Sequence, residues 1–261
     1  VFIGTIYPIF LEVITSEKIS VGPPFYQKLM IPFLIPFLLV MVIGPKLKWI
    51  KSNLENKIYL ILFFITSIFL SIFLVKILKV EFLINTLLIS SAFYLFFISL
   101  KDFFKKKLRN ISQNISHFGF SLLVLSILFN NILSTEKIIN LKIGHTFQSE
   151  NININFEKIY QTEEQNYRNI IGTFRVENSA GVVLFLKPEL RIYNQPNIIT
   201  SEADIKTSLW SDKFITMNIV QNQEYFNIRY QEKPLMIWIW ISAVIISLGG
   251  LTSLFKKKYE N

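Results

Sequence analysis

Five apolar runs of this chain are long enough to cross a lipid bilayer, and they constrain the fold more than any other feature. A spanning helix takes about 20 mostly apolar residues, and about 17 is the lower limit. Hydrophobic residues make up 51% of the chain and charged residues only 17%, which is typical of membrane proteins. The predicted spans are 29–45, 58–75, 82–100, 115–133 and 235–255.

The beginning of the chain adds a partial helix to these spans. The segment Val1–Ile14 is apolar from its first residue and lacks the basic leader of a signal peptide. We interpret it as the end of a sixth helix, so the chain is expected to be the C-terminal portion of a longer protein. The run 29–45 contains Pro32 and Pro36, which predict a kinked helix.

The distribution of basic residues predicts the orientation in the membrane. The linkers 46–57 and 101–109 and the tail 256–258 hold four, five and three Lys or Arg residues, whereas the alternate loops 15–28 and 76–81 hold two each. Loops rich in Lys and Arg stay in the cytoplasm. The segment 134–233 is therefore expected on the outer side of the membrane.

The outer segment reads as β-structure. Partial alternation of apolar and polar residues, interrupted by turn residues, predicts a small barrel or sandwich with a helical turn near 201–210. The predicted fold class is a mainly α-helical polytopic membrane protein with an inserted external all-β domain. Its divisions are helices in 1–133, the β domain in 134–233, and a final helix with a basic tail in 234–261. The predicted strands lie in 154–161, 172–178, 181–193, 214–222 and 224–231.

The charge and composition exclude several kinds of function. The net charge is +9, but 134–233 holds eleven basic and twelve acidic residues, so the excess lies on the cytoplasmic face, next to anionic lipid. Nucleic-acid binding is not predicted, because the sequence contains no basic patch interleaved with aromatic residues. With no cysteine in the chain, disulfides, thiolate metal sites and a cysteine nucleophile are excluded.

His117 is the candidate site residue. It lies in the run 115–133, which has no charged residue, and ionisable groups at membrane depth usually face a partner or a cofactor. Imidazole is also a common axial ligand of haem iron. The alternative is a histidine that donates a hydrogen bond to a backbone carbonyl of a neighbouring helix. His145, the other histidine, is expected in an exposed turn without a role.

Several segments together resemble the CcmF family of cytochrome c maturation proteins, the System I haem lyases. The resemblance extends over essentially the whole chain and preserves the order of the segments. The matching segments are GTIYPIFLEVITSEKISVGPPFY (4–26), IGPKLKW (43–49), SHFGFSLLVL (116–125), LKPELRIYNQP (186–196), TSEADIKTSLWSD (200–212) and KPLMIWIWISAVIISLGGL (233–251).

The resemblance implies membrane machinery that binds haem and attaches it through thioethers to apocytochrome c. It implies a b haem held between two transmembrane histidines, and His117 matches the second of these ligands. It also implies other cytochrome c maturation subunits as partners and a bacterial inner membrane, with a mitochondrial inner membrane as the alternative. The family's Trp-rich external loop, its external haem-binding histidines and its first transmembrane ligand have no counterpart here and are expected upstream of Val1.

The remaining conspicuous residues have ordinary explanations beside functional ones. The predicted loop Gly22-Pro23-Pro24-Phe25 fixes backbone geometry, either as a rigid entry into the next helix or in contact with substrate. Trp238 and Trp240 suit an interfacial aromatic belt. Glu189 and Glu202 are candidates for partner binding or a solvated strand edge.

Two further functions stay open. A non-catalytic assembly scaffold or docking subunit of the same pathway would place the chemistry outside this chain. A small-molecule secondary transporter would show broken helices in corresponding halves and several intramembrane polar groups, whereas only His117 stands out.

Overall fold

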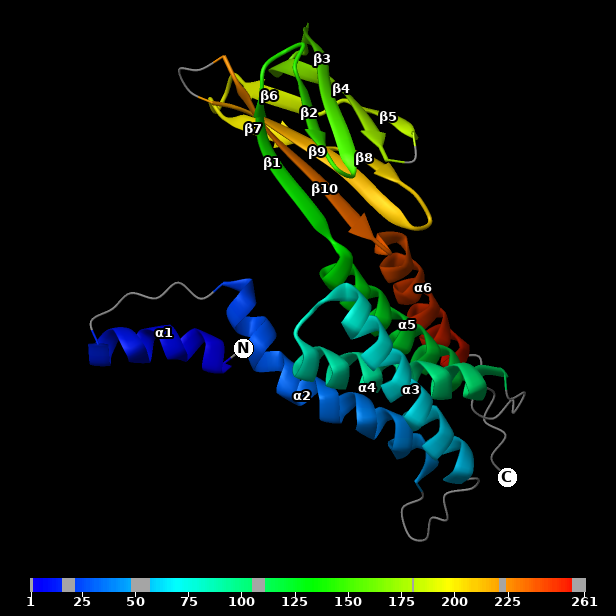
Figure 1. The fold of residues 1–261 in the computed structure, drawn as a ribbon. Helices are drawn as coiled ribbons and strands as arrows, with labels where there is room; N and C mark the ends of the chain where they lie inside the picture. The colour runs from blue at the N-terminus through cyan, green and yellow to red at the C-terminus, as the bar shows by residue number, and fades with distance from the viewer. Residues whose placement is uncertain are drawn as a thin grey trace. The chain divides into compact units, whose positions relative to one another are not determined.

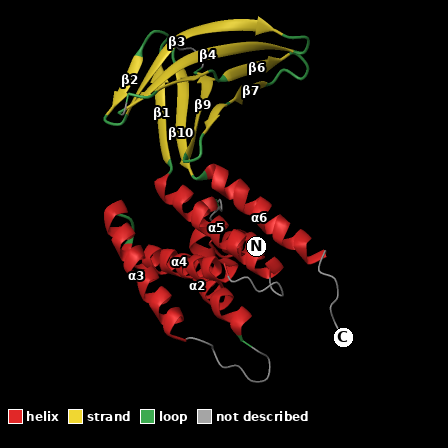
Figure 2. Ribbon diagram, turned by 90° about the vertical axis from the view of Figure 1, so that its right-hand side faces the viewer, coloured by secondary structure: helices red, strands yellow, loops and turns green. Residues whose placement is uncertain are grey.

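The computed structural model describes residues 2–15, 22–47, 57–104, 111–179, 181–220 and 224–254. The chain divides into two compact units, Val1–Leu125 with Ser242–Asn261, and Ser126–Ile241. The first is built from helices, and the second consists mainly of strands (Figures 1 and 2). Much of the basic charge used to predict orientation lies outside the described residues. It belongs to most of the linker 46–57, to the segment 105–110 and to the tail 255–261.

Five helices of the described chain are long and apolar enough to cross a membrane. Each of the five predicted apolar runs coincides largely with one of them, so the helical part of the predicted fold class is confirmed. These five are α2 (Pro23–Ile43), α3 (Lys57–Leu78), α4 (Phe82–Phe104), α5 (Ile111–Leu133) and α6 (Met236–Leu254). The described chain also has the shorter helix α1 (Phe2–Thr15) and a 3-10 helix (Gly44–Lys46) after α2.

The most buried helix of the first unit is α4. Half of its span is buried, against 11% of the spans in α2 and α6, and both α2 and α3 pack against it. The Phe97 ring stacks on Phe93 at 5.8 Å and on Phe63 of α3 at 6.0 Å between centroids. Side-chain shape holds such helices together, because lipid tails are as apolar as the side chains themselves.

Helices α5 and α6 approach closely at two glycines. A Cβ atom on Gly119 would lie 2.9 Å from side-chain atoms of Ile245 and Ile246. A Cβ atom on Gly249 would lie 2.2 Å from Ser116 Oγ and 2.7 Å from its backbone nitrogen. Small residues at such crossings allow two backbones to come together. At this crossing Ser112 Oγ also donates a hydrogen bond to the Gly249 carbonyl at 2.6 Å.

We expect Gly249→Ala to destabilise the contact between α5 and α6 by about 1 to 3 kcal/mol, the usual cost of overpacking. The added methyl group would meet backbone atoms of α5, which do not move aside cheaply. The thermal unfolding midpoint of the protein in lipid nanodiscs measures the effect. Gly250→Ala is the matched control, because nothing lies within 4 Å of a Cβ at that position. Equal midpoints for the two variants would contradict the expected close packing.

The second unit is a sandwich of two antiparallel sheets, which confirms the all-β domain of the predicted fold class. One sheet has the strand order β1-β10-β9-β8 and the other β2-β3-β4-β6-β7, with β5 paired to β4. The strands are β1 (Thr135–Leu141), β2 (Thr146–Ser149), β3 (Ile152–Glu163), β4 (Tyr167–Asn178), β5 (Val183–Leu186), β6 (Glu189–Tyr193), β7 (Ile199–Glu202), β8 (Asp204–Thr207), β9 (Ser211–Ile219) and β10 (Phe226–Pro234).

An apolar core fills the space between the two sheets. Phe156 of β3 and Phe174 of β4 are fully buried and stack at 4.3 Å between ring centroids. Ile215 and Met217 of β9 and Ile228 of β10 belong to the same cluster from the other sheet. Alternate residues of each strand point inward, which explains the partial alternation of apolar and polar residues in the sequence.

The two ends of the domain lie side by side. Strands β1 and β10 pair from Thr135↔Glu232 to Leu141↔Phe226, as Figures 1 and 2 both show. Just before β1, Asn130 Nδ2 donates a hydrogen bond to the Pro234 carbonyl at 2.6 Å. The domain is therefore an insertion whose entry and exit are joined.

Two predictions within the β domain are wrong. The expected helical turn near 201–210 is instead strand, because β7 pairs with β6 and β8 pairs with β9, and Ser201 Oγ bonds to the Met217 carbonyl at 2.7 Å. The single run expected at 181–193 is two strands, β5 and β6. It breaks at Lys187-Pro188, because Pro188 has no N–H for a ladder and the Lys187 N–H donates to Asp204 at 2.6 Å.

Candidate functional site

His117 lies in the second turn of α5 and is half-buried. The helix already begins at Ile111, four residues before the predicted apolar run. Its neighbours fix the rotation of the helix, because Phe118 stacks on Phe103 of α4 at 5.1 Å and Phe120 meets Phe37 of α2 edge-on at 6.1 Å. This orientation places His117 among residues of α2, α4 and α5.

A small polar cluster lies beside the imidazole. Lys46, after α2, forms an ion pair with Asp102 of α4 at 2.5 Å, and both side chains are largely buried. Asn114, one turn before His117, donates its amide to the Asp102 backbone carbonyl at 2.7 Å. Together with His117 these residues line a void of about 20 Å³. The cluster ties the ends of three helices together beside the histidine.

The haem that the resemblance implies is much larger than this void. A space of about 20 Å³ holds about one water molecule, so the side of His117 facing α2 and α4 has no room for a macrocycle. Because the ring is only half-buried, a large ligand would reach it from its exposed side. A single imidazole held in this way fits one axial position of a haem iron.

The described residues contain no group of three or more His, Cys, Asp or Glu that could hold a metal ion. Within the described helical unit, His117 is also the one histidine, since His145 lies in the other unit. The location of a partner histidine outside this chain stays a prediction.

The predicted loop Gly22-Pro23-Pro24-Phe25 is the start of α2. Gly22 is the N-cap in an extended conformation, and the two prolines occupy the first helical positions, where their missing N–H costs nothing. The Phe25 ring stacks on Tyr7 of α1 at 5.4 Å. This geometry accounts for the motif as a rigid entry into a helix, and substrate contact at these residues stays a prediction.

The other sequence candidates lie in the β unit. His145 is exposed in the turn between β1 and β2, where its backbone carbonyl accepts a hydrogen bond from Phe156. Glu189 and Glu202 are opposite each other on β6 and β7, and Glu189 forms an ion pair with Arg191 at 3.0 Å. The sequence did not predict that these two glutamates face each other across adjacent strands, because the register between strands depends on how they pair in the folded sheet.

The Lys46–Asp102 ion pair is the part of the His117 site that sequence reasoning missed. The two residues are 56 positions apart, and Lys46 belongs to a linker interpreted only as topogenic charge. One signal was available, because Asp102 is the single acidic residue among the basic residues of 101–109. An acidic side chain in such a segment indicates a specific partner.

Three comparisons relate the chain to known proteins. A family model described as "CcmF C-terminal beta-sandwich" matches residues 132–234. The cytochrome c-type biogenesis protein CcmF of Pseudomonas fluorescens is 22% identical over 279 residues, and that of Escherichia coli (strain K12) is 24% identical over 270 residues. Each match covers 100% of this chain and 42% of the relative, so the chain spans less than half the length of these relatives.

The fold also matches a solved structure. "Cytochrome c Heme Lyase CcmF" superimposes with a TM-score of 0.72 over 96% of this chain and 42% of that chain, at 18% sequence identity. The fold similarity thus includes nearly all of the helices and strands, and the family model independently identifies the β-sandwich. The resemblance expected from the sequence is confirmed. The chain resembles CcmF proteins along its whole length, and residues 132–234 match the model of that family's C-terminal β-sandwich.

Proposed function

We propose that this chain acts in cytochrome c maturation as part of a membrane haem lyase. In the reaction of such a lyase, apocytochrome thiols add across the haem vinyl groups and form thioethers. The proposal is supported by the match to CcmF relatives along the whole chain and to a solved haem lyase of that name. The chain spans 42% of those proteins, and in this proposal the catalytic external haem-binding loop belongs to the remainder.

The role we assign to this chain is to hold one side of a b haem through His117. The observation that carries this role is a half-buried imidazole in a helix long and apolar enough to span the bilayer. Such residues are rare and usually functional. A haem with two imidazole ligands can change oxidation state without changing its ligands, which suits a site that keeps a substrate haem reduced.

The polar cluster beside His117 positions the imidazole in this proposal. The Lys46–Asp102 ion pair joins α4 to the end of α2, and Asn114 joins α5 to the same aspartate. The three helix ends are thereby held in one arrangement. Groups of this kind, one step removed from the metal, orient the ligand and tune its basicity.

The β domain serves as a docking surface for apocytochrome c or another maturation subunit. It is inserted between two candidate membrane spans, and the charge distribution supports a location outside the cytoplasm. We assign the protein to a bacterial inner membrane with 134–233 in the periplasm, because the matching relatives named above are bacterial. A mitochondrial inner membrane is the alternative that the sequence leaves open.

The test is the reduced-minus-oxidised absorption spectrum of the full-length protein purified from cells without added haem. We expect a sharp α-band typical of six-coordinate b haem, together with dependence of cytochrome c yield on the protein. A full-length protein that restores cytochrome c yield but contains no haem would support the scaffold instead. A protein with neither property would contradict any role in maturation.

A further inference from the structure

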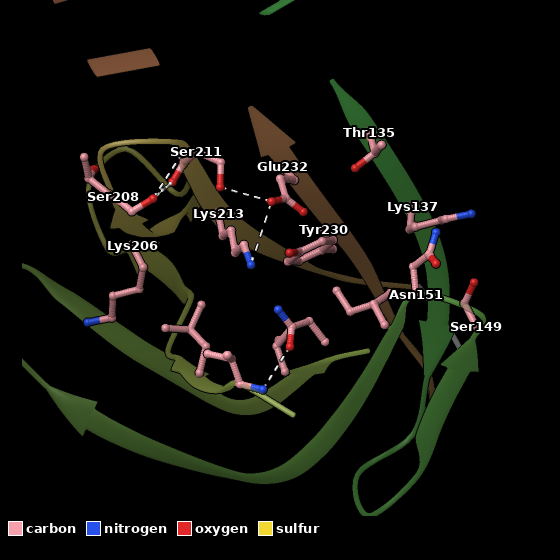
Figure 3. A pocket seen from close by; sticks show the side chains of 16 residues that line it. Thr135, Lys137, Ser149, Asn151, Lys206, Ser208, Ser211, Lys213, Tyr230 and Glu232 are labelled. Atoms are coloured by element: carbon pink, nitrogen blue, oxygen red, sulfur yellow. Dashed lines mark hydrogen bonds and ion pairs between the residues drawn. The ribbon is translucent and has the colours of Figure 1, made fainter. Parts of the chain in front are cut away.

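A second concave site lies in the β domain, between its two sheets. It has a volume of about 450 Å³, within the usual range for small-molecule sites. One wall is the inner face of β1, β10, β9 and β8, and the other is formed by the ends of β3, β4 and β5 (Figure 3). The sandwich is therefore hollow at this end, where the apolar core stops.

The pleat of the sheet explains why polar residues line this hollow. Tyr230, Ile228 and Glu232 alternate on the inner face of β10, and Lys213 and Ile215 do so on β9. The register pairs Tyr230 with Ile215 and Glu232 with Lys213. The inner face thus changes from apolar core at the Tyr230–Ile215 pair to charged residues at the Glu232–Lys213 pair. This change occurs where the hollow begins.

Tyr230 is the residue that most clearly indicates a ligand. Its side chain is 2% exposed, and its hydroxyl is buried without a hydrogen-bond partner among the described residues. Burial, and then the Glu232 carboxylate, raises the pKa of Tyr230 well above its usual value. The hydroxyl is therefore a neutral donor, and leaving a buried hydroxyl without a hydrogen bond destabilises the fold. In Figure 3 it points toward the middle of the hollow.

The charges around the hollow are mostly positive. Three lysines and one glutamate line it. Lys213 and Lys206 are directly opposite on β9 and β8, an arrangement that disfavours pairing unless a counter-charge is present. The single carboxylate, Glu232, lies 3.8 Å from Lys213 Nζ and is also bonded by Ser211 at 3.0 Å. One glutamate leaves the lysines incompletely balanced.

Only one lysine reaches the centre of the site. The ammonium of Lys213 points into the hollow in Figure 3, whereas those of Lys137 and Lys206 point outward on either side. Because Glu232 already offsets part of the Lys213 charge, the centre suits a single negative charge better than two. The opposite wall is apolar, with Ile152, Val176 and Leu184.

We propose that this hollow binds a small amphiphilic carboxylate of the fatty-acid kind. The carboxylate accepts hydrogen bonds from the Lys213 ammonium and the Tyr230 hydroxyl, and the apolar body lies against β3, β4 and β5. Charge-assisted hydrogen bonds of this type are the strong ones in proteins. The site shares no residue with the His117 cluster, so a failed test of carboxylate binding would not contradict the proposed haem ligation, and a failed test of haem ligation would not contradict carboxylate binding.

The probe for this site is hexanoate, titrated calorimetrically into the whole protein in lipid nanodiscs. Hexanol and hexyl phosphate are the matched ligands, one without charge and one with a second charge. We expect hexanoate to bind at least about ten-fold more tightly than hexanol, since a hydrogen bond to a charged group contributes that much or more. Equal binding of hexanoate and hexanol, or tighter binding of hexyl phosphate, would overturn the proposal.

Variants locate the site. We expect Lys213→Gln and Tyr230→Phe each to weaken hexanoate binding by about ten-fold or more. Lys158→Gln and Tyr160→Phe change the same residue types on β3 outside the hollow and should leave binding unchanged. Wild-type affinity in either of the first two variants would contradict the assignment.

The unliganded stability separates a ligand donor from a structural hydroxyl. Tyr230→Phe removes only an oxygen without a partner, so we expect the unfolding midpoint of the ligand-free protein to stay the same or rise. The added stability that hexanoate gives to the wild type should be lost in the variant. A lower midpoint for ligand-free Tyr230→Phe would show that the hydroxyl supports the fold, and the proposal would fail.

Discussion

Replacing His117 by alanine in the full-length protein is expected to remove the b-haem absorption and to lower cytochrome c yield by about ten-fold or more. Loss of a group that only orients a metal ligand already costs 10- to 100-fold, and here the proposed ligand itself is lost. The reduced spectrum of the purified variant and the amount of covalent haem in periplasmic cytochromes measure the two effects.

A second substitution distinguishes a ligand from a packing residue. His117→Gln keeps a polar side chain of similar reach but offers no imidazole to iron, so we expect it to lose haem while retaining the protein's unfolding midpoint. Added imidazole should partly restore the absorption of His117→Ala. His145→Ala is the control, because that exposed residue lies in the β unit and should change nothing. Unaltered absorption in both His117 variants would contradict ligation.

The second large effect is expected in the core of the β domain. Phe156→Ala should destabilise the domain by about 3 to 5 kcal/mol, because removal of a large buried aromatic side chain leaves a cavity. The Phe156 side chain is fully buried, stacks on Phe174 at 4.3 Å and meets Phe226 edge-on at 5.5 Å. The alanine would therefore lose contacts to both sheets at once.

Amide hydrogen exchange of β3 and β4 in the whole protein measures this loss as a lower free energy of opening. Phe185→Ala is the matched control, since that side chain on β5 is 49% exposed and surface changes have small effects. A domain in which both variants exchange at the same rate would have no tightly packed core at Phe156. The docking role of the domain would then need another basis.

Hydropathy predicted the helices well and their first turns poorly. The run beginning at Leu29 belongs to a helix that starts at Pro23, and the run beginning at Ile115 to one that starts at Ile111. Hydropathy reports which residues suit lipid, whereas a helix extends as far as its backbone hydrogen bonds do. Polar residues such as Ser112 and Asn114 are therefore helical without being apolar.

The strands that were missed are mostly the short ones. Strands β2, β7 and β8 have four residues each, too few for alternation to be distinguished from chance. The predicted helical turn at 201–210 was wrong for the same reason, because the pairing of β7 with β6 and of β8 with β9 decides that conformation, and cross-strand partners leave no local pattern. Tertiary context routinely overrides such short-range preferences.

The same distinction between local and long-range features applies to the candidate site. His117 could be found in the sequence because an ionisable residue in an apolar run is a local anomaly. The sequence singles out Asp102 as an acidic residue among basic ones, but neither its pairing with Lys46 nor the burial of the Tyr230 hydroxyl could be predicted, because each depends on neighbours distant in the chain. The lysines of 134–233 were only counted toward the charge of that segment, although Lys213 faces inward.

The pairing of the first and last strands of the β domain sets an order for its assembly during synthesis. Glu136 on β1 bonds to Arg229 on β10, 93 residues later in the chain, and β1 is an edge strand whose neighbour in the sheet is β10. At a synthesis rate of ~5–20 residues per second, β1 waits roughly 5 to 20 seconds for its partner.

An unpaired strand of this kind is a template for aggregation. The charged pair Glu136 and Lys137 at the start of β1 suits that interval, because charges on a waiting edge oppose pairing with other chains. Once β10 is synthesised, the hydrogen bond from Arg229 lowers the pKa of Glu136. The carboxylate that opposes aggregation of the nascent strand thus becomes a cross-strand partner in the complete sheet.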